Sequence, residues 1–583
     1  MSGFLITTLR RTYKLLSKEM RSRIYVVTSL SLLNSFFDLF GLAAVLPILA
    51  ASLKKRMIHE NPFLDFLFRN FHFTSEVKFL FFLSLILILV VVAKNIIGLY
   101  IYKRQVAFSL EVYQDLSNRA LDSIYKKGYG YLKRNNSNKL LNKVVVVPHQ
   151  FAQLLLIQLF QLINEALILL LILVAIAIYD FKILLILFVA VVPSFYFFYV
   201  SNKKQLSVFN ERLNELGPEI AKPVFEIIFG YVDVVVTNTF SFFKKNHFLG
   251  INEGKELRTK LNVLQQIPQR LVETSVIITV VTVLLYGVVA LESSVDLVAL
   301  LGVLGLAAYR SLPSINRMTM SLVHIKGQAF NLDVLEEIIE PNERSESIVD
   351  VSFENRVTLE SLNFKFSDSD RFLFSGVNLE IEKGETVGLI GKSGSGKSTI
   401  INLILGFVKP SSGRVLIDGI ELDGSNIDSW RKKIGYVKQD VFIVDGTLAQ
   451  NIAFGLPDDQ IDYDRLSDSI QRAQLFELVT ELPQGIDTEI GERGSKLSGG
   501  QRQRVAIARA LYHEAKLLLF DEATSALDSE TEREITEAIE KLSDGSLTML
   551  VIAHRHSTLK YCNKIYSLDN EELNLFSTND ISK

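Results

Sequence analysis

Residues 391–399 read GKSGSGKST, and this stretch decides the fold of the C-terminal half of the 583-residue chain. It fits G-x-x-x-x-G-K-[ST], the loop that cradles phosphates in ATP and GTP hydrolases. The apolar run 385–390 before it reads as a buried strand, and 399–405 after it reads as a helix. That order is required, because backbone N–H groups and a helix N-terminus must converge on the phosphates. The sequence therefore predicts a nucleotide site here.

The loop and a second motif supply the residues expected to handle ATP and Mg²⁺. Lys397 is expected to reach the outer phosphates and the Ser398 hydroxyl to bind magnesium. An apolar strand at 517–522 ends in two carboxylates, of which Asp521 is expected at magnesium and Glu522 at the attacking water. The nucleotide contacts expected in the loop are Gly391, Ser393, Gly394, Ser395, Gly396, Lys397, Ser398 and Thr399.

Composition places the first half of the chain in a membrane. The chain is 49% hydrophobic with a mean hydropathy of +0.26, and its apolar residues crowd into the first 310 positions. The net charge of −2 gives no field that points to nucleic acid, so no nucleic-acid partner is expected. Cys562 is the only cysteine, which excludes an intrachain disulfide. The first 20 residues lack a cleavable apolar core, so we expect a cytoplasmic N-terminus.

Six apolar stretches have about the 20 residues needed to cross a bilayer. They run at about 24–53, 77–102, 151–179, 183–202, 270–291 and 296–322. An even number of spans puts both termini and the long connectors inside, where the connectors' lysines and arginines agree with the positive-inside rule. The first outer loop departs from this rule, which indicates either an anionic partner or a different boundary. Its basic residues are Lys54, Lys55, Arg56, Arg69 and Lys78.

Two shorter segments have amphipathic patterns. Residues 4–16 carry Arg10, Arg11 and Lys14 among apolar residues, which predicts a helix on the inner membrane surface or a disordered basic tail. Residues 61–71 have a proline near their start, at position 62, and helically spaced apolar positions. They predict a Phe-rich helix, either at the outer membrane interface or packed as a cap on the domain.

A third motif, LSGGQ at residues 497–501, lies between the phosphate loop and the carboxylate strand and opens an amphipathic helix. With these motifs the chain resembles the ABC transporter family over nearly its whole length. The resemblance implies an all-α polytopic membrane domain of exporter type, with six transmembrane helices, followed by an α/β P-loop ABC ATPase domain. The expected boundaries are 1–326 for the membrane domain, 327–350 for a linker and 351–583 for the ATPase domain. Coupling helices are expected near 136–144 and 230–239.

The resemblance also implies roles for matching positions. Gln439 corresponds to the glutamine loop at magnesium, His554 to the switch histidine at the γ-phosphate, and Asp528 to the D-loop. Phe366 stands where the family usually has an adenine-stacking tyrosine, so stacking is kept and the hydroxyl is lost. The expected catalytic set is Lys397, Gln439, Glu522 and His554.

In this family the signature motif acts on ATP that is held by a second chain. The chain has one phosphate loop and one signature, and neither is degraded, so we expect a homodimer with two composite sites. The signature residues are Leu497, Ser498, Gly499, Gly500 and Gln501.

Cations in the apolar spans point to the cargo. A charge at mid-bilayer costs about 3 kcal/mol on insertion scales, so it normally faces a cavity or a partner. We expect a basic stripe along a central path. An alternative is that Lys94 reaches the inner interface and that the arginines pair with Asp38, Glu165 or Glu273 as internal struts. The residues of the expected path are Lys94, Arg270, Arg310, Ser314 and Arg317.

The run 308–317, the cationic second span and the Phe-rich outer segment resemble lipid-linked oligosaccharide flippases of bacterial protein N-glycosylation. This resemblance implies ATP-driven movement of a polyprenyl-pyrophosphate glycan across the bacterial inner membrane, with the cations at the pyrophosphate. The alternatives are an exporter of another lipid, a drug or a peptide, and an ATP-gated channel or regulator. Six fused spans argue against a soluble ABC ATPase that acts on DNA or ribosomes.

Overall fold

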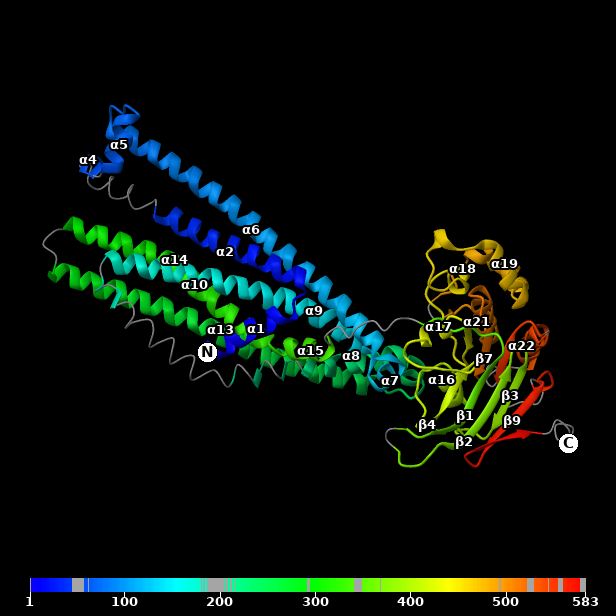
Figure 1. Ribbon diagram of the computed structural model, residues 1–583. Coiled ribbons are helices and arrows are strands. Elements are labelled where there is room, and N and C mark those ends of the chain that lie inside the picture. The colour runs from blue at the N-terminus through cyan, green and yellow to red at the C-terminus, as the bar shows by residue number, and fades with distance from the viewer. Residues whose placement is uncertain are drawn as a thin grey trace. The chain divides into compact units, whose positions relative to one another are not determined.

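The computed structural model divides the chain into two compact units. One comprises Met1–Lys127 with Asn135–Pro341, and the other comprises Gly128–Arg134 with Asn342–Lys583. The first is helical and the second is built on β-sheets (Figure 1). The structure describes residues 2–43, 57–60, 62–179, 181, 184–185, 205, 208–209, 212–213, 215–290, 294–339, 349–366, 369–491, 494–521, 529–543, 545–553 and 559–576.

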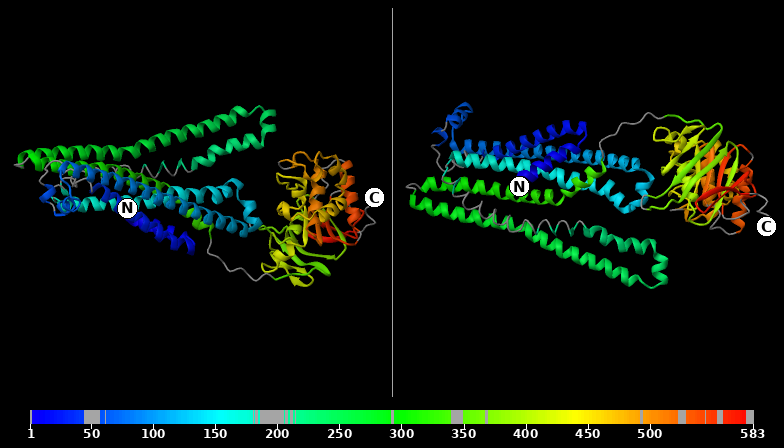
Figure 2. Two further views of the ribbon diagram at one scale, coloured as in Figure 1. Left: turned by 90° about the horizontal axis from the view of Figure 1, so that it is seen from above. Right: turned by 60° about the horizontal axis from the view of Figure 1, so that its bottom comes forward.

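Long helices make up the first unit, and α2, α6, α10 and α14 run side by side (Figure 1, Figure 2). The long helices are α2 (Lys18–Ala43), α6 (Glu76–Lys126), α10 (Ile157–Tyr179), α13 (Phe240–Ala290) and α14 (Ser294–Gly327). The shorter ones are α1 (Ser2–Leu15), α4 (Met57–Glu60), α5 (Pro62–Asn70), α8 (Ser137–Leu141), α9 (Val147–Gln150), α12 (Tyr231–Val236) and α15 (Phe330–Ile338).

Helices lie within five of the six predicted spans, and the fourth, 183–202, falls outside the described residues apart from 184–185. In the part of the chain that is described, two helical stretches have the length and hydropathy of a membrane span. These are Glu76–Lys126, with a mean hydropathy of 2.7, and Ser137–Ile178, with 2.5. The second stretch contains two π-helical turns, η1 (Asn142–Val146) and η2 (Phe151–Leu156), on either side of Pro148. A proline has no N–H to donate to the helical ladder, which accounts for irregular turns around it.

The N-terminal segment is a helix, so the alternative of a disordered tail is wrong. Arg11 of α1 forms ion pairs with Asp333 at 2.6 Å and Glu336 at 2.8 Å, both on α15. Leu15 is buried with the α15 residue Leu335 in one apolar cluster. The helix is therefore fixed through one face.

The predicted Phe-rich helix is present as α5, and its phenylalanines divide between two environments. Phe68 packs edge to face against Phe79 of α6, with ring centroids 5.3 Å apart, and Leu64 is buried beside them. Phe66 of α5 and Phe71, which directly follows the helix, are exposed, at 59% and 57%. One face is thus a packed cap, as one alternative expects, and the other face is open.

The expected coupling segments are only partly as predicted. The short helix α12 lies within the expected 230–239, but 136–144 is occupied by α8 and most of η1. A separate short helix, α7 (Gly128–Arg134), precedes them, because Gly128 takes a left-handed φ of 72° and ends α6. This segment belongs to the second unit, where Tyr129 stacks on Phe407 with ring centroids 4.9 Å apart.

The second unit contains two sheets. A six-stranded sheet has the order β10-β9-β3-β8-β7-β6, and its strands from β9 to β6 are parallel. A four-stranded antiparallel sheet has the order β2-β1-β4-β5. The strands are β1 (Arg356–Phe364), β2 (Phe374–Glu382), β3 (Thr386–Gly391), β4 (Ser412–Ile417), β5 (Ile420–Glu421), β6 (Ile434–Val437), β7 (Leu517–Asp521), β8 (Thr548–Ile552), β9 (Lys564–Asp569) and β10 (Glu572–Phe576).

Helices cover the parallel sheet on both faces. Residues of α16 share a buried cluster with Leu517 and Leu519 of β7, whereas residues of α21 share another with Leu518 and Phe520. This alternation follows from the two-residue repeat of a strand. The helices of this unit are α16 (Lys397–Ile404), α17 (Ile427–Arg431), α18 (Leu448–Ile452), α19 (Tyr463–Arg472), α20 (Phe476–Glu481), α21 (Gly499–Tyr512) and α22 (Ser529–Leu542), with single turns η3 (Asp458–Gln460) and η4 (Gly485–Asp487).

Candidate functional site

The loop between β3 and α16 has the geometry of a phosphate cradle. Gly391, Gly394 and Gly396 adopt φ of 148°, 79° and 109°, which other residues rarely adopt. A Cβ atom on Gly391 would lie 2.4 Å from the Leu568 carbonyl oxygen. The glycines therefore allow the backbone to turn closely before α16 begins, as the sequence predicts.

Lys397 and Ser395 point to an anionic ligand in this loop. Lys397 is 4% exposed, and its Nζ donates to the carbonyl oxygens of Gly391 at 2.9 Å and Lys392 at 3.0 Å. This folds the ammonium back over the loop. The Oγ atom of Ser395 is buried without a hydrogen-bond partner among the described residues. A buried hydroxyl normally has a partner, and a phosphate oxygen would supply one.

Asp521 joins two hydroxyl groups at the carboxyl edge of the parallel sheet. Ser398 donates its Oγ–H to Oδ1 at 2.8 Å, and Tyr436 donates its phenolic O–H to Oδ2 at 3.0 Å. Hydroxyl and carboxylate oxygens are ligands that Mg²⁺ prefers, so Ser398 and Asp521 fit the ion. Gln439 follows β6 at the same edge of the sheet and is exposed.

Tyr436 is a site residue that the sequence analysis missed. Burial, together with the charge of Asp521 and the hydrogen bond to it, raises the pKa of the Tyr436 phenol far above its usual value. The phenol is therefore protonated at neutral pH and acts as the donor. Its signal in the sequence was a tyrosine near the end of a buried strand, three residues before Gln439, but only the sheet order places it beside Asp521.

Phe366 lies two residues after the end of β1 and leaves part of its ring open. The side chain is 52% exposed, and its ring meets Phe364 edge to face with centroids 5.1 Å apart. An adenine ring could stack on this open surface, which is the use the sequence predicts.

The signature residues form the start of α21. The Ser498 hydroxyl accepts from the Gln501 N–H at 3.2 Å, and the Gln501 amide oxygen accepts from the Ser498 N–H at 2.8 Å. This reciprocal cap fixes the first turn, in which Gly500 is buried and Gly499 is half-buried; Leu497, which precedes the cap, is also buried. The N-terminus of a 14-residue helix is electropositive, which suits contact with a phosphate.

Three predicted site residues, Glu522, Asp528 and His554, lie outside the described residues. Their roles at the attacking water, the D-loop and the γ-phosphate stay predictions. Asp521, directly before Glu522, is described and ends β7 as expected.

In the first unit one carboxylate joins two of the predicted path cations. Asp38 of α2 accepts from the Lys94 ammonium of α6 at 2.8 Å and from the Arg310 guanidinium of α14 at 2.7 Å. The three side chains are 22%, 19% and 17% exposed. We call these three residues the Asp38 triad; it carries a net charge of +1.

Of the other predicted path residues, the two arginines form ion pairs with carboxylates and the serine does not. Arg317 pairs with the buried Glu165 of α10 at 2.5 Å, and Arg270 pairs with Glu273 one turn away at 3.0 Å. The Ser314 Oγ is buried and lacks a partner among the described residues. The carboxylates are those named by the alternative in which the arginines serve as internal struts, and all three pairs are present in the structure.

Comparisons with known proteins agree with this arrangement. A family model described as ABC transporter matches residues 374–525. The solved structure of a bacterial Atm1-family ABC exporter with ATP bound is similar at a TM-score of 0.76, covers 96% of both chains and is 22% identical, which supports the fold. The chain has the fold of an ABC exporter and carries an ABC transporter domain.

Sequence relatives of this chain match a smaller region of it than the solved structure does. ATP-dependent lipid A-core flippases of Ralstonia nicotianae and Francisella novicida are 45% identical over 215 residues and 44% identical over 216 residues. Each match covers 37% of this chain, and the chain spans only 36% of the length of these relatives.

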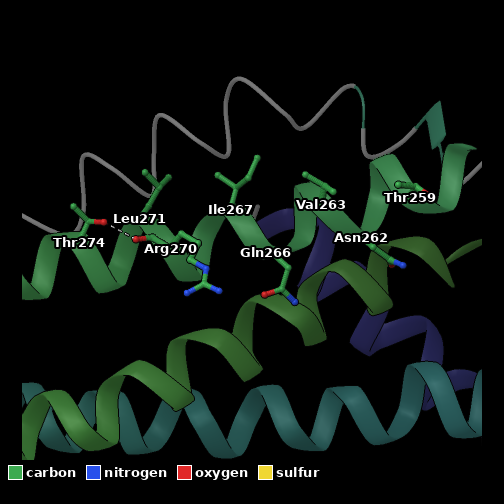
Figure 3. A pocket seen from close by; sticks show the side chains of 8 residues that line it. All are labelled: Thr259, Asn262, Val263, Gln266, Ile267, Arg270, Leu271 and Thr274. Carbon is green, nitrogen blue, oxygen red and sulfur yellow. Dashed lines mark hydrogen bonds between the residues drawn. The ribbon is translucent and has the colours of Figure 1, made fainter.

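The long helix α13 carries Arg270 in a groove of about 600 Å³ (Figure 3). Figure 3 shows Asn262, Gln266 and Arg270 pointing to one side of the helix, and Val263, Ile267 and Leu271 pointing to the other. Thr259 and Thr274 complete the lining. Arg270 thus belongs to a mixed polar and apolar surface on α13, whereas Lys94 and Arg310 meet at the Asp38 triad.

Proposed function

We propose that this chain is one half of an ATP-driven exporter that moves an anionic lipid-linked glycan, of the polyprenyl-pyrophosphate type, across the bacterial inner membrane. The Asp38 triad is the observation that carries the substrate class. Two cations share one carboxylate there, so among the residues that the structure describes one positive charge of the triad has no carboxylate partner. A phosphate or pyrophosphate has the complementary charge, and guanidinium and ammonium groups bind it well.

ATP binding is assigned to the loop after β3. Lys397, the Ser395 hydroxyl and the loop N–H groups contact the phosphates, and Phe366 stacks on the adenine. Ser398, Asp521 and Gln439 hold Mg²⁺, which supplies positive charge against the phosphates when it is bound. Glu522 orients and deprotonates the attacking water, and His554 contacts the γ-phosphate, as the sequence predicts.

A second copy of the chain completes each ATP site in this proposal. Ser498, Gly499 and Gly500 at the start of α21 contact the phosphates of ATP held by the partner, with Leu497, Gln501 and Asp528 beside them. The electropositive N-terminus of α21 and its rigid cap support this role. The ATPase domain and both termini lie in the cytoplasm, and the first unit lies in the bilayer.

Neutral replacement of the triad cations tests the cargo. The double variant Lys94→Gln and Arg310→Gln is reconstituted in liposomes. It should flip a pyrophosphate-linked glycolipid at least tenfold more slowly than wild type. The reason is that each cation contributes about 4 kcal/mol of gross Coulomb energy to a phosphate 4 Å away at a dielectric of about 20. Its ATP hydrolysis without cargo should stay within about twofold of wild type. Arg212→Gln is the matched control, because Arg212 is also ion-paired, to Glu219 and Glu253, but outside the triad. Equal flipping by the double variant and the control would exclude the triad as the anion site.

The names of the relatives favour one other cargo, lipid A-core. The same liposome assay separates the candidates when it is run with the pyrophosphate-linked glycolipid, lipid A-core and an uncharged lipid. If only one of these lipids stimulates ATP hydrolysis by the protein, that lipid identifies the class of the cargo. Stimulation by an uncharged lipid, a drug or a peptide alone would support the broader exporter alternative.

A further inference from the structure

We propose that Tyr436 is a positioning residue that orients Asp521 for the cation of the ATP site. This inference rests on the proposed function, because it takes Asp521 and Ser398 as the Mg²⁺-binding pair. It adds a residue that neither the phosphate loop nor the signature contains. Tyr436 acts through Asp521 and is not expected to touch the nucleotide.

The sheet brings the two side chains together. Strands β6 and β7 are parallel neighbours, with Tyr436 opposite Leu519. Side chains alternate along a strand, so Leu517, Leu519 and Asp521 face α16, and Tyr436 packs against the same buried cluster. The phenol therefore reaches across one strand spacing to the carboxylate that ends β7.

Each of the two carboxylate oxygens of Asp521 accepts a hydrogen bond from a different hydroxyl. Tyr436 occupies Oδ2 at 3.0 Å, and the Ser398 hydroxyl occupies Oδ1 at 2.8 Å. The terminal torsion of an aspartate is broad, so a carboxylate at a strand end needs a second contact to hold one orientation. The phenol supplies that contact and leaves Oδ1 on the side of Ser398, where a cation held by the serine hydroxyl would need it.

The hydroxyl of Tyr436 holds the orientation of Asp521, and the ring has a separate role. The ring is packed in the core, where a phenylalanine would fill the same space. Tyr436 also lies on the strand that leads into Gln439, so the orientation of Asp521 is tied to the segment that carries the third predicted magnesium contact. Loss of the hydroxyl should weaken cation binding and leave nucleotide binding intact.

The test compares Tyr436→Phe with wild type in the full-length chain in detergent. Bound Mn²⁺, a paramagnetic stand-in for Mg²⁺, is titrated by electron paramagnetic resonance in the presence of saturating ATP. The Kd for Mn²⁺ should rise roughly tenfold, the usual effect of removing a partner of a metal-binding side chain. The Mg²⁺ concentration for half-maximal ATP hydrolysis should rise similarly, with kcat at saturating Mg²⁺ within about twofold of wild type.

Tyr512→Phe is the matched control. The Tyr512 hydroxyl is also buried and accepts the Asp462 N–H at 2.9 Å, but it lies at the far end of α21. This variant should keep the wild-type Kd for Mn²⁺. Nucleotide binding in EDTA and the melting temperature are measured for all three proteins, so that a general folding defect is visible.

Each result decides the inference. A Kd for Mn²⁺ within twofold of wild type in Tyr436→Phe overturns it. Loss of nucleotide binding in EDTA also overturns it, because Tyr436 would then be a packing residue. If wild type itself binds no Mn²⁺ with ATP, the proposed ATP site fails, and this outcome is distinct from failure of Tyr436 alone.

Discussion

Asp38 sets the net charge of the Asp38 triad in the first unit. Its carboxylate is the shared partner of Lys94 and Arg310, and all three side chains are mostly buried. Removing one member of a buried ion pair destabilises a protein, because the remaining charge stays in a region of low dielectric. The same change also makes the remaining cations available to an anionic ligand. Stability and cargo affinity should therefore move in opposite directions at this residue.

Asp38→Asn tests that opposition. The triad charge rises from +1 to +2, so the melting temperature should fall, with a loss of about 1–3 kcal/mol because the residues are partly exposed. The affinity for a pyrophosphate-linked lipid, measured as the lipid concentration for half-maximal stimulation of ATP hydrolysis, should rise severalfold. Asp115→Asn, which breaks the Arg119–Asp115 pair on α6, should leave the affinity unchanged. Weaker lipid binding in Asp38→Asn would show that the aspartate serves the cargo directly.

Cys562 gives a prediction on pH. Burial raises the pKa of its thiol to about 12, and its Sγ would lie 3.1 Å from a Cβ placed on Gly388. Only about one thiol in 10⁴ is then ionised at pH 8, and the thiolate is the reactive form. The folded chain should resist maleimide labelling at pH 8 and label rapidly in denaturant. Because the unfolded thiol ionises near pH 8.5, folding stability should decline as the pH rises above that value. Rapid labelling of the folded chain, followed by mass spectrometry, would contradict the burial.

At the scale of elements, two helices in the ATPase domain begin with the same cap. Thr447 and Gln450 bond reciprocally at the start of α18, as Ser498 and Gln501 do at the start of α21. The caps are chemically matched, but only α21 carries the signature sequence. They therefore separate a structural effect of the cap from a functional one.

Ser498→Ala and Thr447→Ala should each lose about 1 kcal/mol of helix stability, the usual effect of losing an N-cap. Only Ser498→Ala should also lose ATP hydrolysis, by tenfold or more, if its hydroxyl and the helix N-terminus contact the partner's ATP. Hydrogen exchange of the first-turn amides measures the first effect and phosphate release measures the second. Equal activity in the two variants would make the Ser498 cap purely structural.

Local motifs made part of the site predictable from the sequence. Lys397 and Ser398 are placed by the spacing of their own loop, and β3 and α16 flank that loop as predicted. The contact between Tyr436 and Asp521 depends on which strands are neighbours, and 85 residues separate the two positions in the chain. Pairing across such a distance is decided by sheet order, which no local pattern encodes.

At the scale of the whole molecule, the exporter fold was predictable because hydropathy and motif order act over long stretches. The ion-pair partners of Arg310 and Arg317 were harder to predict. The sequence offered both a cargo path and internal struts, and only helix packing shows Asp38 at Arg310 and Glu165 at Arg317. The start of α7 was also missed, because it depends on the left-handed backbone at Gly128.

Mixed dimers test whether two chains share each ATP site. Chains with Lys397→Ala should be inactive alone, and so should chains with Ser498→Arg. In a dimer that contains one chain of each variant, one ATP site carries both defects and the other carries neither. In an equal mixture about half of the dimers are mixed, so about a quarter of wild-type ATP hydrolysis should be recovered if the sites work independently. No recovery, with mixed dimers confirmed by differential affinity tags, would contradict a site completed by the partner.

The central claim is that ATP hydrolysis drives movement of an anionic lipid-linked glycan across the bilayer. It is tested most directly by flipping of a fluorescent pyrophosphate-linked glycolipid in sealed liposomes that contain either wild type or Glu522→Gln. Wild type should flip the lipid only when ATP is supplied, and Glu522→Gln should bind ATP yet flip none, because the water is no longer activated. Full flipping by Glu522→Gln, or flipping by wild type without ATP, would contradict the account and indicate a gated channel.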